Sequence, residues 1–305
     1  MARNRVKLGS LTKQIQDVLD SKLAIGESKH KAKKEGTAKD KIYSWSTYKN
    51  YMKHIHYFTD YCKEKYNVRT LAECKQYVPE YIKSCVDRGL SPYTQKAYAC
   101  SLAKLYSCSS SDFGVKTDVR HRANITRSRE VVDRDKHFSE EKNKELVEFC
   151  KSTGLRRNEL KYITGDRLYK NDEGNYMIHV SIGTKGGKER DIPVIGDINN
   201  VIRLMNNAGS GRVFNKISSA ADIHSYRSDY ATSLYKSISR KIDDIPFDKI
   251  NKGTGRAYQS EVYVCRAELK GVKYDKVAML EVSKALGHNR ISVIAEHYLR
   301  DIKEE

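Results

Sequence analysis

Cationic, histidine and tyrosine side chains gather in four short motifs in the second half of the chain. The motifs are Thr153-Gly154-Leu155-Arg156-Arg157-Asn158-Glu159-Leu160, Thr184-Lys185-Gly186-Gly187-Lys188-Glu189-Arg190, His224-Ser225-Tyr226-Arg227, and Leu286-Gly287-His288 with Tyr298 ten residues further on. Cleavage of a phosphodiester without metal or ATP needs a nucleophile, an acid for the leaving group and positive charge around the phosphate. Together the four motifs contain side chains for all three tasks.

The natural charge pair is Arg156 and Arg227. A guanidinium stays protonated and can hold two phosphate oxygens in a planar fork, which lysine cannot do. By analogy with oxyanion-hole donors, each could stabilise the transition state by about 3 kcal/mol. Arg157 is the competing candidate in its motif. Glu159 could orient that arginine or a nearby histidine, or it could be an ordinary surface residue of a helix.

The lysines and histidines offer proton transfer. Lys185 falls where a hairpin is expected to turn, and an ammonium group there can protonate a departing 5′ oxygen. Lys188, on the same turn, is the alternative and is otherwise a phosphate contact. His224 and His288 are suited to hydrogen bonding with the phosphate or to removal of the proton from a tyrosine nucleophile. A histidine on a helix is, however, commonly structural. A zinc site is not expected, because no His/Cys spacing of the required kind surrounds them.

The order of these motifs resembles the tyrosine recombinases, the phage integrase family, over roughly residues 44 to 305. In that family the catalytic arginine directly follows Gly-Leu, which selects Arg156 over Arg157. The resemblance implies that Lys185, His224, Arg227 and His288 complete the catalytic set. It also implies that Tyr298 is the nucleophile.

The activity implied by the resemblance is site-specific DNA recombination. Tyr298 would attack the scissile phosphorus and give a 3′-phosphotyrosine and a free 5′-hydroxyl. No cofactor is expected, because the covalent bond retains the energy of the phosphodiester. Two rounds of single-strand exchange would follow, with four protomers holding two duplexes of double-stranded DNA. We expect a monomer free in solution, a homo-tetramer in the synaptic complex, and an accessory DNA-bending or directionality factor as a further partner.

Three alternatives remain open from the sequence. A Xer-like resolvase or invertase would use the same chemistry, and the basic N-terminus and an apparent insertion within residues 240–274 mildly favour the integrase of a mobile element or phage. A type IB topoisomerase would cut DNA without site preference. A non-catalytic DNA-binding protein is the third, and the presence of all six expected residues speaks against it.

The composition favours a polyanionic partner. The chain has 305 residues, a net charge of +18 and a pI near 9.4, which suits nucleic acid. No run of eighteen apolar residues is present, so we expect no membrane association and a cytoplasmic, nucleoid-associated protein. The seven cysteines include no C-x-x-C pair. They are therefore interpreted as reduced thiols and not as metal ligands.

The pattern along the chain predicts a mostly α fold with a small antiparallel β-sheet. Residues 1–42 are interpreted as a basic N-terminal extension, in which the lysine-rich stretch 29–41 is either a solvated linker or an arm that follows DNA phosphates. The apolar pattern of residues 43–117 predicts a helical domain, interpreted as the core-binding domain that clamps DNA. It contains an amphipathic helix from Trp45 and another that starts at Ser91-Pro92. Its candidate DNA contacts are Lys49, Lys53 and Lys96.

A basic interdomain linker is predicted over 118–136, with Arg120, Arg122 and Arg127 as DNA contacts. Residues 137–305 then predict a mixed α+β catalytic domain. Ser139 is an expected helix N-cap, and the alternating runs 176–182 and 190–195 predict a hairpin around Gly183–Lys188. Beyond about residue 197 the pattern is mostly helical, apart from an extra hairpin or loop expected within 240–274.

Overall fold

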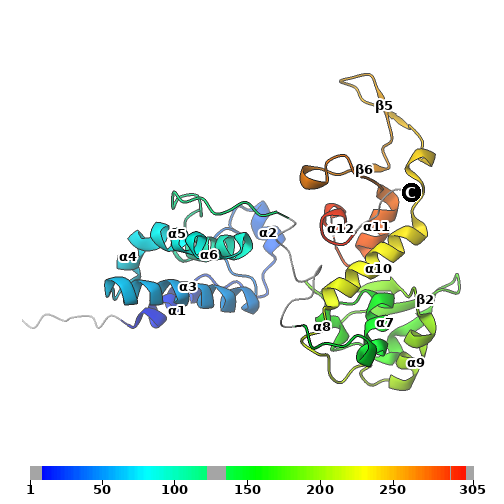
Figure 1. Cartoon of the computed structure of the whole chain (residues 1–305), viewed down its shortest axis with the longest axis horizontal. Helices are drawn as coiled ribbons and strands as arrows, with labels where there is room; N and C mark the ends of the chain where they lie inside the picture. The colour runs from blue at the N-terminus through cyan, green and yellow to red at the C-terminus, as the bar shows by residue number, and fades with distance from the viewer. Residues whose placement is uncertain (1–8, 122–134, 289, 300–305) are drawn as a thin grey trace, which may run out of the picture. The chain divides into compact units, whose positions relative to one another are not determined.

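The computed structural model describes residues 9–121, 135–288 and 290–299. The chain divides into two compact units, Met1–Asn124 and Ile125–Glu305 (Figure 1). The division falls within the linker predicted over 118–136. Most of that linker, including Arg122 and Arg127, lies outside the described residues.

The first unit is helical. Its elements are α1 Leu11–Asp20, α2 Lys29–Lys34, α3 Trp45–Tyr66, α4 Leu71–Cys74, the 3-10 turn Lys75–Tyr77, α5 Val78–Asp87 and α6 Pro92–Leu105. The Ser44 hydroxyl accepts a hydrogen bond from the Thr47 amide and begins α3, and Asn67 ends that helix in the left-handed conformation. The Ser91 hydroxyl begins α6 in the same way, with Pro92 at the first helical position. The predicted start of α6 is thus present.

The core of this unit extends into the N-terminal residues. Ile15 and Leu19 of α1 are fully buried in the same cluster as Ile55 and Phe58 of α3. The sequence predicts an extension over 1–42, and here the structure differs. A ten-residue helix buries its apolar face only against a partner, and α3 is that partner. The lysine-rich stretch interrupts the apolar pattern without ending the unit, because Ile42 beyond it is buried in the same core.

The described residues of the second unit form helices and three small antiparallel sheets. Its helices are α7 Lys144–Thr153, α8 Arg157–Leu160, α9 Ile198–Ala208, α10 Ile223–Ile238, α11 Lys276–Ala285 and α12 Ser292–His297. Short 3-10 turns are at Glu141–Asn143, Gly165–Arg167, Ile242–Asp244 and Ala267–Leu269. The Ser139 hydroxyl caps the first of these turns by accepting from the Lys142 amide, so α7 begins later than the sequence suggests.

The main sheet contains the predicted hairpin. Strands β1 Leu168–Lys170, β2 Tyr176–Val180 and β3 Arg190–Pro193 pair antiparallel in the order β1-β2-β3. The buried residues Ile178 and Ile192 face each other across β2 and β3. The loop between these two strands carries Lys185 and Lys188. The three-residue strand β1 is too short to be recognised from alternation.

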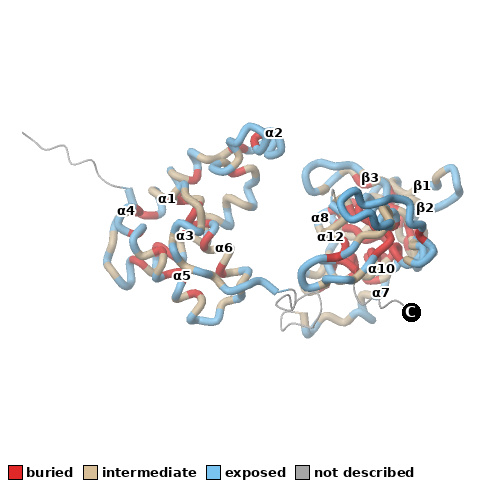
Figure 2. Tube along the Cα trace, turned by 90° about the horizontal axis from the view of Figure 1, so that it is seen from above, coloured by how far each residue is buried: buried red, intermediate tan, exposed pale blue. Residues whose placement is uncertain are grey.

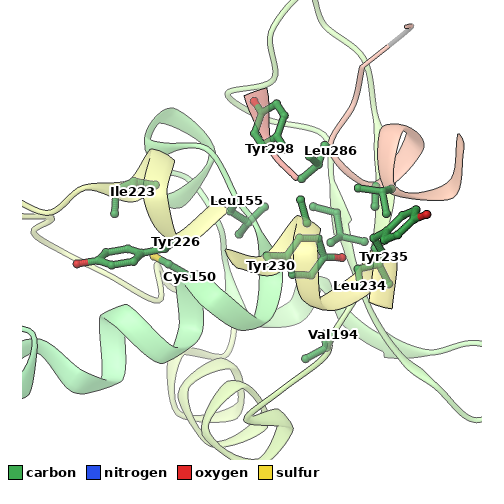
Figure 3. Packing of buried hydrophobic residues seen from close by; sticks show 14 of the residues in the cluster. Cys150, Leu155, Val194, Ile223, Tyr226, Tyr230, Leu234, Tyr235, Leu286 and Tyr298 are labelled. Atoms are coloured by element: carbon green, nitrogen blue, oxygen red, sulfur yellow. The ribbon is translucent and has the colours of Figure 1, made fainter. Parts of the chain in front are cut away.

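Helix α10 runs through the middle of this core. Tyr226, Tyr230 and Leu234 are buried along it, and α7 and α11 pack against it. Figure 3 shows these side chains together with Leu155 and Leu286. Figure 2 shows the buried positions along the helices of each unit. Arg227 lies on the same buried side of α10 as the apolar residues, so the core itself fixes its position.

Two further two-stranded sheets lie where an extra hairpin is expected. Strand β4 Lys249–Ile250 pairs with β5 Ala257–Tyr258, and β6 Val262–Val264 pairs with β7 Lys273–Asp275. Arg240 holds the end of α10 to β7 through a forked ion pair, with its Nε and Nη2 at 2.8 and 2.9 Å from the Asp275 carboxylate. None of the described helices is long and apolar enough to cross a membrane.

Candidate active site

A tight turn after α7 places the first arginine motif. Gly154 has a φ of 59°, and a Cβ at this position would collide with the buried ring of Tyr230. A glycine therefore meets both the conformational and the steric demand of the turn. Leu155, fully buried, anchors the chain directly afterwards, and Arg156 becomes the N-cap of α8.

The two adjacent arginines of the motif point to different partners. Arg156 donates from Nη1 to the Glu159 carboxylate at 2.8 Å and from Nη2 to the Leu286 carbonyl at 2.6 Å. Arg157 instead donates to the carbonyl oxygens of Ser218, at 2.6 Å, and Ala221. Arg157 thus ties α8 to the segment before α10, whereas Arg156 lies at the Leu286–His288 turn.

Arg227 is almost completely buried, with 2% of its surface exposed. It donates to the carbonyl oxygens of Gly154 and Leu286, and its Nε lies 3.5 Å from the Tyr298 hydroxyl. Burial lowers the pKa of its guanidinium to about 10, so Arg227 remains charged at neutral pH. A buried charge is costly unless it is hydrogen-bonded. The two backbone carbonyls provide these bonds.

Tyr298 directly follows α12 and lies between two histidines. Its hydroxyl is 3.0 Å from His288 Nε2, and its ring meets the exposed His224 ring edge to face at a centroid distance of 5.3 Å. Burial, followed by the charges of Arg227, Arg156 and Lys185, lowers the pKa of His288 to about 4. His288 is therefore neutral at neutral pH. A neutral imidazole with its hydrogen on Nδ1 can accept the Tyr298 proton at Nε2.

Glu159 is the centre of an ion-pair network. Its carboxylate accepts from the Arg156 backbone amide at 2.7 Å and from both terminal nitrogens of Arg190, at 2.9 and 2.8 Å. Burial by itself raises the pKa of this carboxyl, but the hydrogen bonds and charge of Arg190, together with Arg156, lower it to about 2. Glu159 is thus ionised and orients Arg156, one of the alternatives left open by the sequence.

Arg190 ends the motif Thr184–Arg190, but no role was predicted for it from the sequence. One signal could have found it. The alternation in the strand run 190–195 places Arg190 on the same side as Ile192 and Val194, both buried. An arginine on an inward face needs a buried acceptor. Of the carboxylates in the four motifs, only Glu159 is buried.

The loop that carries Lys185 is attached to α8 at its base. Asn158 donates to the Gly183 carbonyl at 2.9 Å, and a Cβ at Gly183 would lie 2.7 Å from the Asn158 carbonyl oxygen. Lys185 and Lys188 are exposed further along the loop. The Lys185 charge is among the causes of the lowered His288 pKa. Of the six predicted catalytic residues, the structure places Arg227, His288 and His224 against Tyr298. Arg156 is linked to Arg227 through the shared Leu286 carbonyl, and Lys185 lies within electrostatic reach of His288.

The predicted DNA contacts of the first unit are partly exposed. Lys49 and Lys53 are exposed on α3, and Lys53 Nζ lies 5.8 Å from the centre of the Tyr57 ring. Lys96 is half-buried and donates to the Ser110 hydroxyl at 2.9 Å, which makes it less available. Arg120 is exposed and lies over the ring of Tyr93 at 5.7 Å.

An open hollow of about 360 Å³ lies beside these residues, lined by Lys53, His54, Tyr57, Tyr93, Thr94, Ala97 and Tyr98. Over the described parts of both units, no group of three or more His, Cys, Asp or Glu residues could hold a metal ion.

Comparison with known proteins gives structural matches only. No family model matches the chain, and no curated protein sequence matches it. The fold is similar to that of the Tn1549 transposon integrase in complex with circular intermediate DNA, at 13% identity and a TM-score of 0.45, with 96% of each chain covered. A variant of that integrase with transposon right end DNA matches at 12% identity and a TM-score of 0.44, covering 96% of this chain and 95% of that one. XerA recombinase matches at 14% identity and a TM-score of 0.29, with 95% of each chain covered.

Proposed function

We propose that this chain is a tyrosine recombinase that cleaves and rejoins double-stranded DNA through a 3′-phosphotyrosine intermediate. One observation carries the proposal. The Tyr298 hydroxyl lies against His288 and Arg227, and Arg156 donates to the same Leu286 carbonyl as Arg227. A nucleophile, a proton acceptor and two guanidinium groups therefore meet at one place.

The chemistry follows from these positions. The Tyr298 oxygen attacks the scissile phosphorus while its proton passes to His288 Nε2, and the bond from phosphorus to the 5′ oxygen breaks. Lys185 supplies the proton that the departing 5′ oxygen takes up. Arg156 and Arg227 donate to the non-bridging oxygens, where charge increases in the transition state. His224, which is exposed and meets the Tyr298 ring edge to face, is a further phosphate donor.

Rejoining reverses the same steps. The phosphotyrosine bond keeps the free energy of the phosphodiester, so a 5′-hydroxyl from a second duplex can attack it and release Tyr298. No nucleotide is consumed. We propose that four copies of the chain hold two duplexes during this exchange, and that the protein acts as the integrase of a mobile element or phage.

Covalent capture tests the proposal. Wild type, Tyr298→Phe and Tyr230→Phe are each incubated with the DNA that flanks the gene and denatured rapidly, and the attached DNA is sequenced. Tyr230 is the matched control because it is also buried and its hydroxyl donates to the Pro193 carbonyl, away from Tyr298. We expect wild type and Tyr230→Phe to carry DNA at a narrow set of sites, and Tyr298→Phe to bind DNA without attachment.

Other outcomes identify the alternatives. Attachment scattered over all DNA indicates a type IB topoisomerase. If no DNA is attached to wild type, the assay is repeated with a substrate nicked close to the cleavage site. Cleavage then releases a short strand with the free 5′-hydroxyl, which dissociates, so that religation cannot hide cleavage. A second negative result contradicts the proposal and indicates a DNA-binding protein without catalysis.

A further inference from the structure

Arg190 has its donors directed into the protein. Its side chain is 7% exposed, and Nη1 and Nη2 form a fork on the fully buried Glu159 carboxylate. Its Nε donates to the Ala285 carbonyl at 2.8 Å. Arg190 is therefore oriented by three hydrogen bonds and has little surface from which to contact DNA directly.

One carboxylate thus serves two guanidinium groups. Glu159 accepts from Arg190 and from Arg156, so the three side chains together carry one net positive charge. If Arg190 were absent, Glu159 and Arg156 would form an isolated pair with no net charge. The Arg156 guanidinium would then stabilise an anionic phosphate less well, because a neighbouring carboxylate would offset its charge.

The same arginine lies against the turn that bears the other site groups. Gly287 has a φ of 63°, and a Cβ on it would lie 3.2 Å from the Arg190 Cδ and Nη1. The Ala285 carbonyl that Arg190 holds directly precedes Leu286, whose carbonyl accepts from both Arg156 and Arg227. His288 follows two residues later. Arg190 thus supports the backbone from which three candidate catalytic side chains take their positions.

We infer that Arg190 is a positioning residue of the DNA-cleavage site, which neutralises Glu159 so that Arg156 keeps its charge for the phosphate and which holds the Ala285–His288 turn in place. This inference rests on the proposed function. It assigns Arg190 a role without contact to DNA, exerted through Glu159 and the turn.

Double substitution separates this role from simple structural support. We measure the rate of covalent attachment to a nicked substrate at saturating protein, together with the dissociation constant for DNA. Arg190→Met is expected to lower the rate on the order of 100-fold, the size of loss typical when reacting groups are misplaced. Adding Glu159→Gln removes the unneutralised charge, so the double variant is expected to regain about tenfold in rate.

A matched control exists in the same unit. Arg240 forms an equivalent fork on the buried carboxylate of Asp275, outside the Tyr298 cluster. Arg240→Met is expected to lower the melting temperature while the folded protein attaches DNA at the wild-type rate. If Arg190→Met does not fold, Arg190→Lys keeps the charge without the fork, and a rate about tenfold below wild type is expected.

Three results overturn the inference. The first is an attachment rate of Arg190→Met, or of Arg190→Lys if that variant is needed, equal to wild type. The second is a double variant no faster than Arg190→Met, which indicates structural support without charge neutralisation. The third is absence of attachment by wild type. This third result contradicts the proposed function itself. It can be told apart from the first two results, because those are observed only when wild type is active.

Discussion

Arg156 and Arg227 donate to one and the same acceptor, the backbone carbonyl oxygen of Leu286. Arg156 comes from the start of α8 and Arg227 from the buried side of α10, so the shared acceptor fixes the spacing of the two guanidinium groups. The turn that bears this carbonyl also leads to His288, which lies against Tyr298. The turn is therefore the element on which the site is organised.

Replacement of Gly287 by alanine tests the role of the turn. An alanine with positive φ costs about 1–2 kcal/mol, and its Cβ must in addition displace the Arg190 side chain. We expect urea unfolding to show a loss of stability above that range, and covalent attachment to slow. Gly174→Ala is the control, because Gly174 has a φ of 80° with nothing within 4 Å of an added Cβ. Equal losses of stability in the two variants would contradict the close approach of Arg190.

The neighbours Arg156 and Arg157 should respond differently to substitution by glutamine. Under the proposed function, Arg156→Gln removes a charged donor to the phosphate, and we expect attachment to fall roughly 100-fold, or about 3 kcal/mol in activation free energy. Arg157→Gln loses bonds to the Ser218 and Ala221 carbonyls. It should lower the unfolding free energy by about 2 kcal/mol with little change in the rate of the folded protein. The reverse pattern would show that the wrong arginine was assigned to the phosphate.

His288 gives the protein a predictable pH dependence. Its pKa is lowered from 6.5 to about 4, so between these values the unfolded chain binds more protons than the native protein, and stability rises with pH. This contribution is complete above pH 6.5 and is lost as the pH falls towards 4. We expect the difference in unfolding free energy between wild type and His288→Gln to grow in favour of wild type from pH 4.5 to 7. A constant difference across that range would contradict the buried, neutral state of His288.

The exposed lysines of α3 are predicted to contact DNA phosphates. Removal of one phosphate contact lowers the slope of log affinity against log salt by about 1. We expect Lys53→Ala to show this change and to weaken binding for all sequences alike. Lys65→Ala is the control on the same helix, because Lys65 is paired with Glu80. Equal salt slopes for wild type and Lys53→Ala would remove Lys53 from the DNA interface.

Local signals in the sequence predicted local structure well. Ser44 and Ser91 begin the helices expected around Trp45 and Pro92, and the alternating runs form the hairpin β2–β3. Such features depend on residues only a few positions apart, where capping and side-chain periodicity dominate. The resemblance to tyrosine recombinases then selected Tyr298 and Arg227, which the structure places in contact.

Long-range contacts were harder to predict. Arg190 binds Glu159 and Ala285 across the fold, and neither partner is marked by spacing. The Leu286 carbonyl is a backbone atom that every residue has, so sequence patterns cannot reveal its role. The packing of α1 on α3 was missed for the same physical reason, since burial depends on a partner distant in the chain.

Identification of the amino acid bonded to DNA tests the central claim most directly. Wild-type protein is trapped on a nicked substrate and digested with trypsin and nuclease, and the nucleotide-bearing peptide is sequenced by mass spectrometry. The account predicts a single peptide that carries a 3′-phosphate nucleotide on Tyr298. A nucleotide on another tyrosine, or a link through a 5′-phosphate, would contradict it.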